Sequence, residues 1–172
     1  CRHVLAKNHP KDYKEVKLFL SDVDGTLTDG GMYYSENGDE LKKFNTRDGM
    51  GMNMLQSKGI KIGIITSEDR KLNQRRADKL HLDYFCQGKA NGGKLDTVNG
   101  IVEKMGISLA NVAYIGDDVN CLQLLSAVGF AACPSDASSA VKNIPYIEIM
   151  QRRGGYGCVR EFCDKILNGL QL

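Results

Sequence analysis

The sequence has no tryptophan, only three prolines and no long hydrophobic run. No stretch approaches the ~20 apolar residues of a membrane-spanning helix, so we expect no membrane association. Its 23 basic and 21 acidic residues leave a net charge of +2, which provides no strong field for binding nucleic acid. The three prolines stand beside 19 glycines, a balance that favours tight turns between regular elements over proline-rich linkers.

The sequence also lacks a Cys-x-x-Cys pair and a signal peptide, since residues 1–4 contain no apolar stretch. Cys86 and Cys133 lie in apolar, strand-like runs, where buried reduced thiols are expected. These features predict a reducing, cytoplasmic compartment. The chain does not begin with Met, and we interpret the polar residues 1–15 as a leader or linker of a longer protein. We expect one globular domain over residues 16–172.

Short apolar runs alternate with helical patterns along that domain. The runs lack the polar alternation of a half-exposed strand, which is typical of a parallel sheet covered on both faces. They occupy residues 17–20, 61–65, 83–86, 112–115 and 129–133. Between them, apolar residues recur at helical spacing, as at Leu95, Val98 and Val102. The alternation predicts an α/β fold with a Rossmann-like, doubly wound parallel sheet.

One segment interrupts the alternation. Asn37-Gly38 separates two strand-like runs, 32–35 and 40–44, and this dipeptide is a strong signal for a β-hairpin. The hairpin would project from the sheet directly after the first strand. No insertion is long enough to form a separate cap domain.

Polar side chains follow three of the predicted strands. Asp22 and Asp24 come after the first strand, Thr66 after the second and Asp117 after the fourth, while Lys94 opens the helix before that fourth strand. A single aspartate in such a place usually caps a helix or turn. Ligands of open α/β sheets, however, bind at the carboxyl ends of the strands. Three carboxylates, a hydroxyl and an ammonium group at one edge therefore predict a common site.

The chemistry of this predicted site follows from its charges. Three close carboxylates repel one another, so we expect a cation among them, and hard oxygen ligands favour Mg²⁺. One aspartate kept ionised against the cation can attack phosphorus and form an aspartyl phosphate. Asp24 can protonate the leaving oxygen and then deprotonate water. Thr66 and Lys94 can bind the phosphoryl oxygens. The pattern predicts a Mg²⁺-dependent phosphatase.

The same residues carry a resemblance to haloacid dehalogenase superfamily phosphatases, extending over residues 16–168. The four motifs appear in order as Asp22-x-Asp24-Gly25-Thr26, Thr66, Lys94 and Gly116-Asp117-Asp118. The resemblance implies that Asp22 is the nucleophile and Asp24 the general acid and base, with Thr66 and Lys94 as the other catalytic residues. It also implies that Asp22, Asp24 (through its carbonyl) and Asp117 bind Mg²⁺.

Longer segments resemble one branch of this superfamily, the capless enzymes that act on 2-keto-3-deoxy sugar acid phosphates. Residues 22–30, the hairpin, and residues 44–51 and 153–161 carry this resemblance. Members of the branch form tetramers in which the hairpins meet and a neighbouring subunit replaces the cap. A homotetramer is therefore implied. We also expect the glycine-rich stretch 154–157 to form a mobile loop that closes over substrate.

The segment after the second strand suggests which sugar acid is bound. Octulosonate enzymes of the branch typically carry Gly-Arg there, whereas this chain has Ser67-Glu68, which resembles the nine-carbon, sialic-type enzymes. A glutamate can accept hydrogen bonds from hydroxyls, and basic side chains can pair with a carboxylate, although a solvated basic helix face is the alternative. The implied substrate-binding residues are Glu68, Arg76, Lys79, Thr46 and Arg47.

Besides Ser67, which replaces the usual glycine, the chain departs from the family pattern in two further places. Cys121 stands where many relatives have an aspartate near the metal or the motif lysine, which puts metal affinity and the placement of Lys94 in question. The stretch 88–93 is slightly longer than is common before the motif lysine, which makes Lys89 a weaker competitor for the role of Lys94.

We predict a phosphatase for a sialic-type, nine-carbon sugar acid 9-phosphate, with 3-deoxy-manno-octulosonate 8-phosphate as the alternative substrate. A third possibility is a non-catalytic oligomerisation domain of a CMP-sialic acid synthetase, fused to or partnered with a cytidylyltransferase domain. The intact acidic cluster argues against this scaffold.

Overall fold

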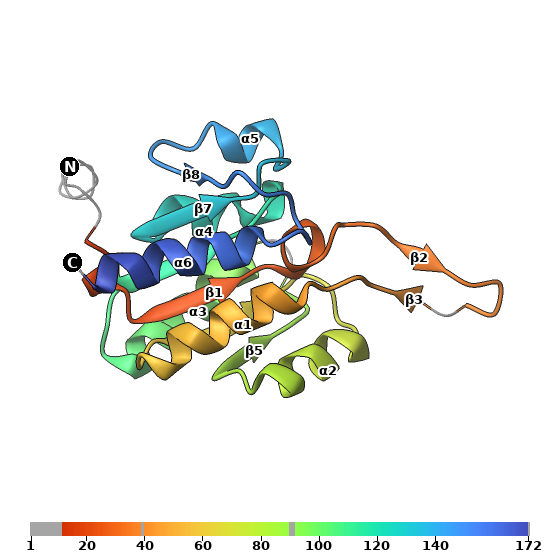
Figure 1. Ribbon diagram of the computed structural model, residues 1–172, viewed down its shortest axis with the longest axis horizontal. Coiled ribbons are helices and arrows are strands. Elements are labelled where there is room, and N and C mark those ends of the chain that lie inside the picture. Colours follow the sequence, from red (N-terminus) through yellow and green to blue (C-terminus); the bar gives the residue numbers. More distant parts are fainter. Residues whose placement is uncertain (1–11, 39, 90–91, 172) are drawn as a thin grey trace.

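The computed structural model describes residues 12–38, 40–89 and 92–171 (Figure 1). Its centre is a six-stranded, wholly parallel sheet in the order β5-β4-β1-β6-β7-β8. The strands are β1 Leu18–Ser21, β4 Lys61–Ile65, β5 Tyr84–Cys86, β6 Val112–Ile115, β7 Phe130–Cys133 and β8 Glu148–Ile149. The first five occupy the apolar runs that predicted them. The sequence did not predict the edge strand β8, because a strand of two residues, one of them exposed, is too short to show a hydrophobic pattern.

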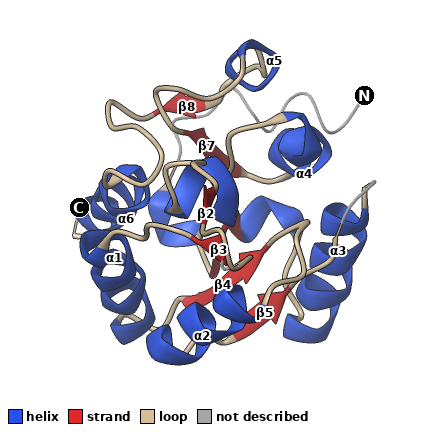
Figure 2. Cartoon of the chain, turned by 90° about the vertical axis from the view of Figure 1, so that its right-hand side faces the viewer, coloured by secondary structure: helices blue, strands red, loops and turns tan. Residues whose placement is uncertain are grey.

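Helices cover both faces of the sheet, as Figure 2 shows. The helices are α1 Thr46–Ser57, α2 Lys71–Leu80, α3 Gly93–Met105, α4 Leu122–Ala127, α5 Ser139–Lys142 and α6 Cys158–Leu170. One core joins Phe19 of β1 to residues of α1 and α6. The other joins the neighbouring Leu18 and Leu20 to α3 and α4. Successive side chains of one strand thus enter opposite cores, and the predicted Rossmann-like α/β fold is confirmed.

The predicted hairpin extends from the body beyond the end of β1 (Figure 1). It consists of the antiparallel strands β2 Tyr33–Tyr34 and β3 Glu40–Leu41, and a bridge between Thr28 and Phe44 closes its base. Its apolar side chains at Tyr34 and Leu41 are exposed. Asp39 of the predicted tip lies outside the described residues.

The predicted leader is only partly visible. Residues 1–11 lie outside the described residues, whereas Tyr13–Glu15 forms a short turn that packs on the body. The Tyr13 ring stacks on Phe130 with 5.5 Å between centroids, and its hydroxyl donates to Glu148 at 2.5 Å. Within the described ranges, no helix has the length and apolar character needed to cross a membrane.

Candidate active site

The carboxyl ends of three adjacent strands bring the predicted residues together. β1 lies between β4 and β6 in the sheet, so Asp22, Thr66 and Asp117, which follow these strands, share one edge. Lys94 reaches the same edge from the first turn of α3. Asp22, Thr66 and Lys94 are buried, with at most 3% of their surface exposed. Buried charges at the ends of strands require partners, and the surrounding contacts supply them.

A tight turn after β1 shapes this edge. Asp22 accepts a hydrogen bond from the backbone N–H of Val23 through Oδ1 (2.8 Å). Gly25 has φ +77°, and a Cβ at this position would lie 2.0 Å from Oδ2 of Asp117. Only glycine combines this backbone conformation with such a close approach of a carboxylate. The motif glycine therefore lets the turn after β1 meet the aspartate after β6.

Five residues form what we call the nucleophile cluster: Asp22, Lys94, Tyr114, Asp117 and Cys121. The Lys94 ammonium donates to Oδ2 of Asp22 (2.7 Å), and the Cys121 thiol donates to the same oxygen (2.9 Å). The Tyr114 hydroxyl donates to Sγ of Cys121 at 3.1 Å, and Lys94 lies 3.3 Å from that sulfur. Cys121 thus joins the contacts that hold Lys94 on Asp22.

Lys89, the weaker candidate, does not take this place. Its backbone N–H donates to the carbonyl of Thr66 (3.0 Å), and its own carbonyl accepts from Ser67 (3.3 Å). These contacts tie the segment after β5 to the end of β4. The structure therefore brings Lys94 to Asp22, as predicted.

Burial controls the protonation of this cluster. Burial, reinforced by Asp22 and Asp118, raises the pKa of Asp117 to about 7. Burial also raises the pKa of Cys121 to about 12, with Asp22 adding to the effect, so the thiol stays protonated and can donate. For Lys94, burial opposes the charge, but the neighbouring Asp22 outweighs it and the pKa is raised. An ionised Lys94 thus contacts Asp22, whose charge in turn raises the pKa of Asp117.

The cluster has the donor set for a hard cation. One oxygen each of Asp22 and Asp117 and the sulfur of Cys121 lie within 4.8 Å of one another. Carboxylate oxygens suit Mg²⁺, whereas a protonated thiol is a poor ligand for it. A cation between Asp22 and Asp117 would offset their repulsion, which is part of the cause of the raised Asp117 pKa. These residues therefore fit a Mg²⁺ site.

The Asp24 carboxylate turns to a second group, which we call the leaving-group triad: Asp24, Lys42 and Glu68. Lys42 follows β3 directly, and its ammonium donates to Asp24 Oδ1 (2.6 Å) and Glu68 Oε2 (2.5 Å). Its side chain is fully covered, whereas 32% of the Asp24 side chain and 38% of the Glu68 side chain remain exposed. Sequence reasoning missed Lys42, since a lysine within a strand-like run carries no spacing signal.

Four predicted substrate-binding residues lie elsewhere in the described chain. Arg76 donates to the carbonyl of Asn45 (3.1 Å) and lies over the Phe44 ring, 5.2 Å from its centroid. Its guanidinium is thus engaged between α2 and the start of α1. Exposed positions on these two helices hold the other three, Lys79, Thr46 and Arg47. Within the described chain, no hydrogen bond or ion pair joins any of the four to the nucleophile cluster or the leaving-group triad.

The glycine-rich stretch packs against the catalytic turn. Gly154 is buried, and a Cβ there would lie 1.9 Å from the carbonyl oxygen of Gly25. Gly155 donates its N–H to the carbonyl of Thr26 (3.0 Å). In this conformation these glycines support the turn that carries Asp24, and closure of the stretch over substrate stays a prediction.

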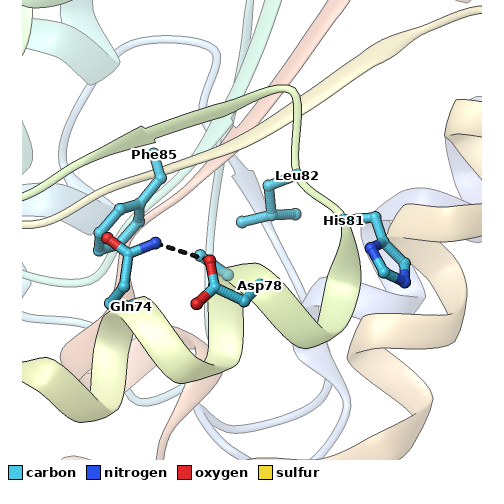
Figure 3. Close-up of a pocket in the computed structure, with 6 residues that line it drawn as sticks. Gln74, Asp78, His81, Leu82 and Phe85 are labelled. Atoms are coloured by element: carbon cyan, nitrogen blue, oxygen red, sulfur yellow. Dashed lines mark hydrogen bonds between the residues drawn. The ribbon is translucent and has the colours of Figure 1, made fainter.

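A hollow is lined by residues of α2, of the turn that follows it and of β5 (Figure 3). There Gln74 donates to Asp78 at 2.7 Å. None of the residues that line this hollow belongs to the nucleophile cluster or the leaving-group triad, so the hollow is separate from the candidate active site. The lining consists of Gln74, Ala77, Asp78, His81, Leu82 and Phe85.

Comparisons with known proteins agree with this geometry. Residues 47–129 match the family model of the haloacid dehalogenase-like hydrolases. The chain is 38% identical over 155 residues to the 3-deoxy-D-manno-octulosonate 8-phosphate phosphatase of Escherichia coli K12, covering 90% of this chain and 80% of the relative. It is 37% identical to the same enzyme of Salmonella typhimurium over 166 residues, covering 96% of this chain and 84% of the relative.

Solved structures give the same result. The Moraxella catarrhalis 3-deoxy-D-manno-octulosonate 8-phosphate phosphatase, in complex with magnesium, phosphate and KDO, superimposes with a TM-score of 0.86 at 36% identity. The match covers 92% of this chain and 89% of that one. The cobalt-bound deoxy-D-mannose-octulosonate 8-phosphate phosphatase of Haemophilus influenzae also superimposes with a TM-score of 0.86, at 32% identity. That match covers 94% of this chain and 92% of the other.

Proposed function

The chain belongs to the haloacid dehalogenase-like hydrolases and is a Mg²⁺-dependent phosphatase, and from this premise we propose that it acts on a 2-keto-3-deoxy sugar acid phosphate. The observation that carries the proposal is the buried pairing of Asp22 with Lys94 beside Asp117. A charged cluster of this kind is expensive to bury in a mere scaffold. Its presence, together with phosphatase relatives over most of the chain, favours catalysis over a non-catalytic oligomerisation domain.

We propose that the substrate is 3-deoxy-D-manno-octulosonate 8-phosphate. The relatives named for this substrate match 90% of the chain or more. They do not support the sialic-type substrate that the sequence suggested. One observation still favours a nine-carbon sugar acid 9-phosphate as the second candidate. Glu68 lies in the leaving-group triad beside Asp24, where it would contact the sugar rather than the phosphate.

The geometry supports a two-step reaction. Asp22 attacks phosphorus and forms an aspartyl phosphate, while Asp24 gives its proton to the departing sugar oxygen. Asp24 then takes a proton from the water that hydrolyses the intermediate, which restores Asp22 and releases phosphate. Lys94 offsets negative charge, and the Thr66 hydroxyl can donate to a phosphoryl oxygen. Asp22, Asp117 and the Asp24 carbonyl would hold Mg²⁺, which when bound neutralises charge on the phosphoryl group.

Assembly is a separate part of the proposal. The projecting hairpin exposes Tyr33, Tyr34 and Leu41, and apolar side chains of this kind favour contact with another protein surface. We propose the homotetramer that the family resemblance implies, which sedimentation would test. Fusion to, or partnership with, a cytidylyltransferase domain stays a prediction.

The test is phosphate release with Mg²⁺ from both sugar acid phosphates. We expect a higher kcat/KM for the octulosonate 8-phosphate, and a preference for the nine-carbon 9-phosphate would transfer the proposal to the second candidate. If the nine-carbon substrate is preferred, Glu68→Arg should change the ratio of the two kcat/KM values toward the octulosonate 8-phosphate, by about tenfold for one lost contact. If neither sugar acid phosphate has a higher kcat/KM than simple aryl phosphates, the proposed function is wrong.

A further inference from the structure

Lys42 is held by both partly exposed carboxylates of the candidate site. Its ammonium donates to Asp24 at 2.6 Å and to Glu68 at 2.5 Å, and these partners follow two different strands of the sheet. Lys42 itself comes from neither strand, since it follows β3 at the base of the hairpin. One lysine thus connects three segments that are distant in the sequence.

The burial of Lys42 distinguishes it from an ordinary surface ion pair. Exposed pairs contribute about 0–1 kcal/mol, because water competes with them and the side chains lose freedom. Here the lysine side chain is fully covered. The adjacent Lys43 provides the contrast, because 46% of its side chain is exposed and its ion pair with Asp29 is longer, at 3.4 Å.

The contact with Lys42 also orients the Asp24 carboxylate. Lys42 occupies Oδ1, and no other side chain of residues 12–38, 40–89 and 92–171 donates to either Asp24 oxygen. With Oδ1 held, the second oxygen is left for the leaving group. An acid catalyst must lie within about 2.6–3.2 Å of the atom that it protonates, so such orientation affects the rate directly.

We infer that Lys42 is a positioning residue that holds Asp24 toward the leaving oxygen and couples it to Glu68 on the substrate side. The inference rests on the proposed function only for the role of Asp24 as the acid. Because Lys42 belongs to the hairpin segment, it makes proton donation depend on where that segment lies. Its loss should impair the departure of poor leaving groups and spare good ones, which leave without a proton.

The experiment compares phenyl phosphate with p-nitrophenyl phosphate for the full chain in saturating Mg²⁺. Phenolate needs protonation more than p-nitrophenolate does. We expect Lys42→Met to lower kcat/KM for phenyl phosphate by about tenfold or more, but that for p-nitrophenyl phosphate by less than about threefold. Both esters are measured on one preparation, so partial misfolding cancels in the ratio.

Two further variants sharpen the result. Lys42→Arg keeps the charge and should keep the ratio within about threefold of wild type, whereas Lys43→Met, the matched neighbour, should leave both substrates within about twofold. Equal losses on the two esters in Lys42→Met, or no loss on either, would overturn the inference. The proposed function fails separately, if the wild type does not prefer sugar acid phosphates to phenyl phosphate.

Discussion

The nucleophile cluster and the leaving-group triad are built into the fold to different depths. In the cluster, Asp22, Lys94 and Cys121 are almost completely buried at the carboxyl ends of the central strands β1 and β6. In the triad, about a third of the Asp24 and Glu68 side chains stays exposed, and the lysine between them comes from the hairpin segment. The parts that act on phosphorus are therefore fixed by the core. The parts that face the sugar depend on a projecting element.

This difference has an energetic consequence. Removing one partner of a buried ion pair costs about 3–5 kcal/mol, because a charge is left uncompensated. Exposed pairs contribute much less. Substitutions in the nucleophile cluster should thus change both stability and all phosphatase activity. Those in the leaving-group triad should change how activity depends on the leaving group and the sugar.

The largest effect is expected for Asp22→Asn. The amide cannot form the covalent intermediate, so phosphate release should fall by at least about 10³-fold with every substrate, including p-nitrophenyl phosphate. Lys94 also loses its carboxylate partner at 2.7 Å. Steady-state assays together with thermal unfolding measure both effects. If Asp22→Asn kept a tenth of the wild-type activity, the nucleophile cluster would not contain the group that attacks phosphorus, and its contrast with the leaving-group triad would fail.

A second test separates two adjacent aspartates. Asp117 faces Asp22 across the candidate metal site, whereas the exposed Asp118 accepts a hydrogen bond from Val119 and begins a short turn. Asp117→Asn should lower phosphate release by about 10²-fold and raise the Mg²⁺ concentration needed for half activity.

The matched control is Asp118→Asn, which should stay within about threefold of wild type, since asparagine also caps turns well. Chelation of Mg²⁺ should abolish activity in both proteins, and added Mg²⁺ should restore Asp118→Asn at wild-type concentrations. A similar Mg²⁺ requirement in the two variants would show that Asp117 does not bind the cation.

Residues that follow buried strands were predictable from the sequence. The two-sided apolar run of β1 locates its carboxyl end, and the equivalent runs locate Thr66 and Asp117, so their convergence with Asp22 follows from the rules of parallel sheets. Lys94 was found through its motif, and the structure confirms that it reaches Asp22. These positions are fixed by regular structure, which local patterns encode well.

Contacts made by the hairpin and by α2 were not predictable in this way. Lys42 meets Asp24 and Glu68 only because of the direction in which the hairpin leaves the body, and no sequence period encodes that direction. Arg76 looked like a substrate ligand on a basic helix, yet it is engaged by the carbonyl of Asn45. A basic helix face does not reveal which of its side chains turns inward.

Cys121 offers a smaller test within the nucleophile cluster. Its sulfur contacts Asp22, Lys94 and Tyr114, and alanine would remove a buried hydrogen-bonding partner from all three. We expect Cys121→Ala to lower the free energy of unfolding by about 1–3 kcal/mol and kcat by several-fold. Cys121→Ser keeps a donor and acceptor and should retain most of both. Urea unfolding and kcat measurements compare the two variants. If Cys121→Ala and Cys121→Ser had equal stability and equal kcat, the hydrogen bonds of Cys121 would have no role in the cluster.

The smallest effect on activity is expected at Asp48, which is as buried as Asp22 but belongs to neither half of the site. It accepts a hydrogen bond from the backbone N–H of Arg160 (2.8 Å), joining the starts of α1 and α6. Its second oxygen has no hydrogen-bond partner among the residues that the structure describes. If burial alone determined function, Asp48→Asn would impair catalysis. We expect kcat to stay within about twofold, because the change is local to the junction of the two helices.

Stability should respond to Asp48 instead, with a defined pH dependence. Burial raises the pKa of Asp48 from 3.8 to about 6, so the folded protein binds this proton more tightly than the unfolded chain does. The group's favourable contribution is therefore complete below about pH 4 and is lost as the pH rises to about 6. Asparagine does not titrate, so its contribution to stability does not change with pH. The difference in unfolding free energy, wild type minus Asp48→Asn, should therefore fall by on the order of 2–3 kcal/mol between about pH 4 and pH 6. Urea unfolding at both ends measures it, and parallel pH profiles of the two proteins would show that Asp48 does not titrate there.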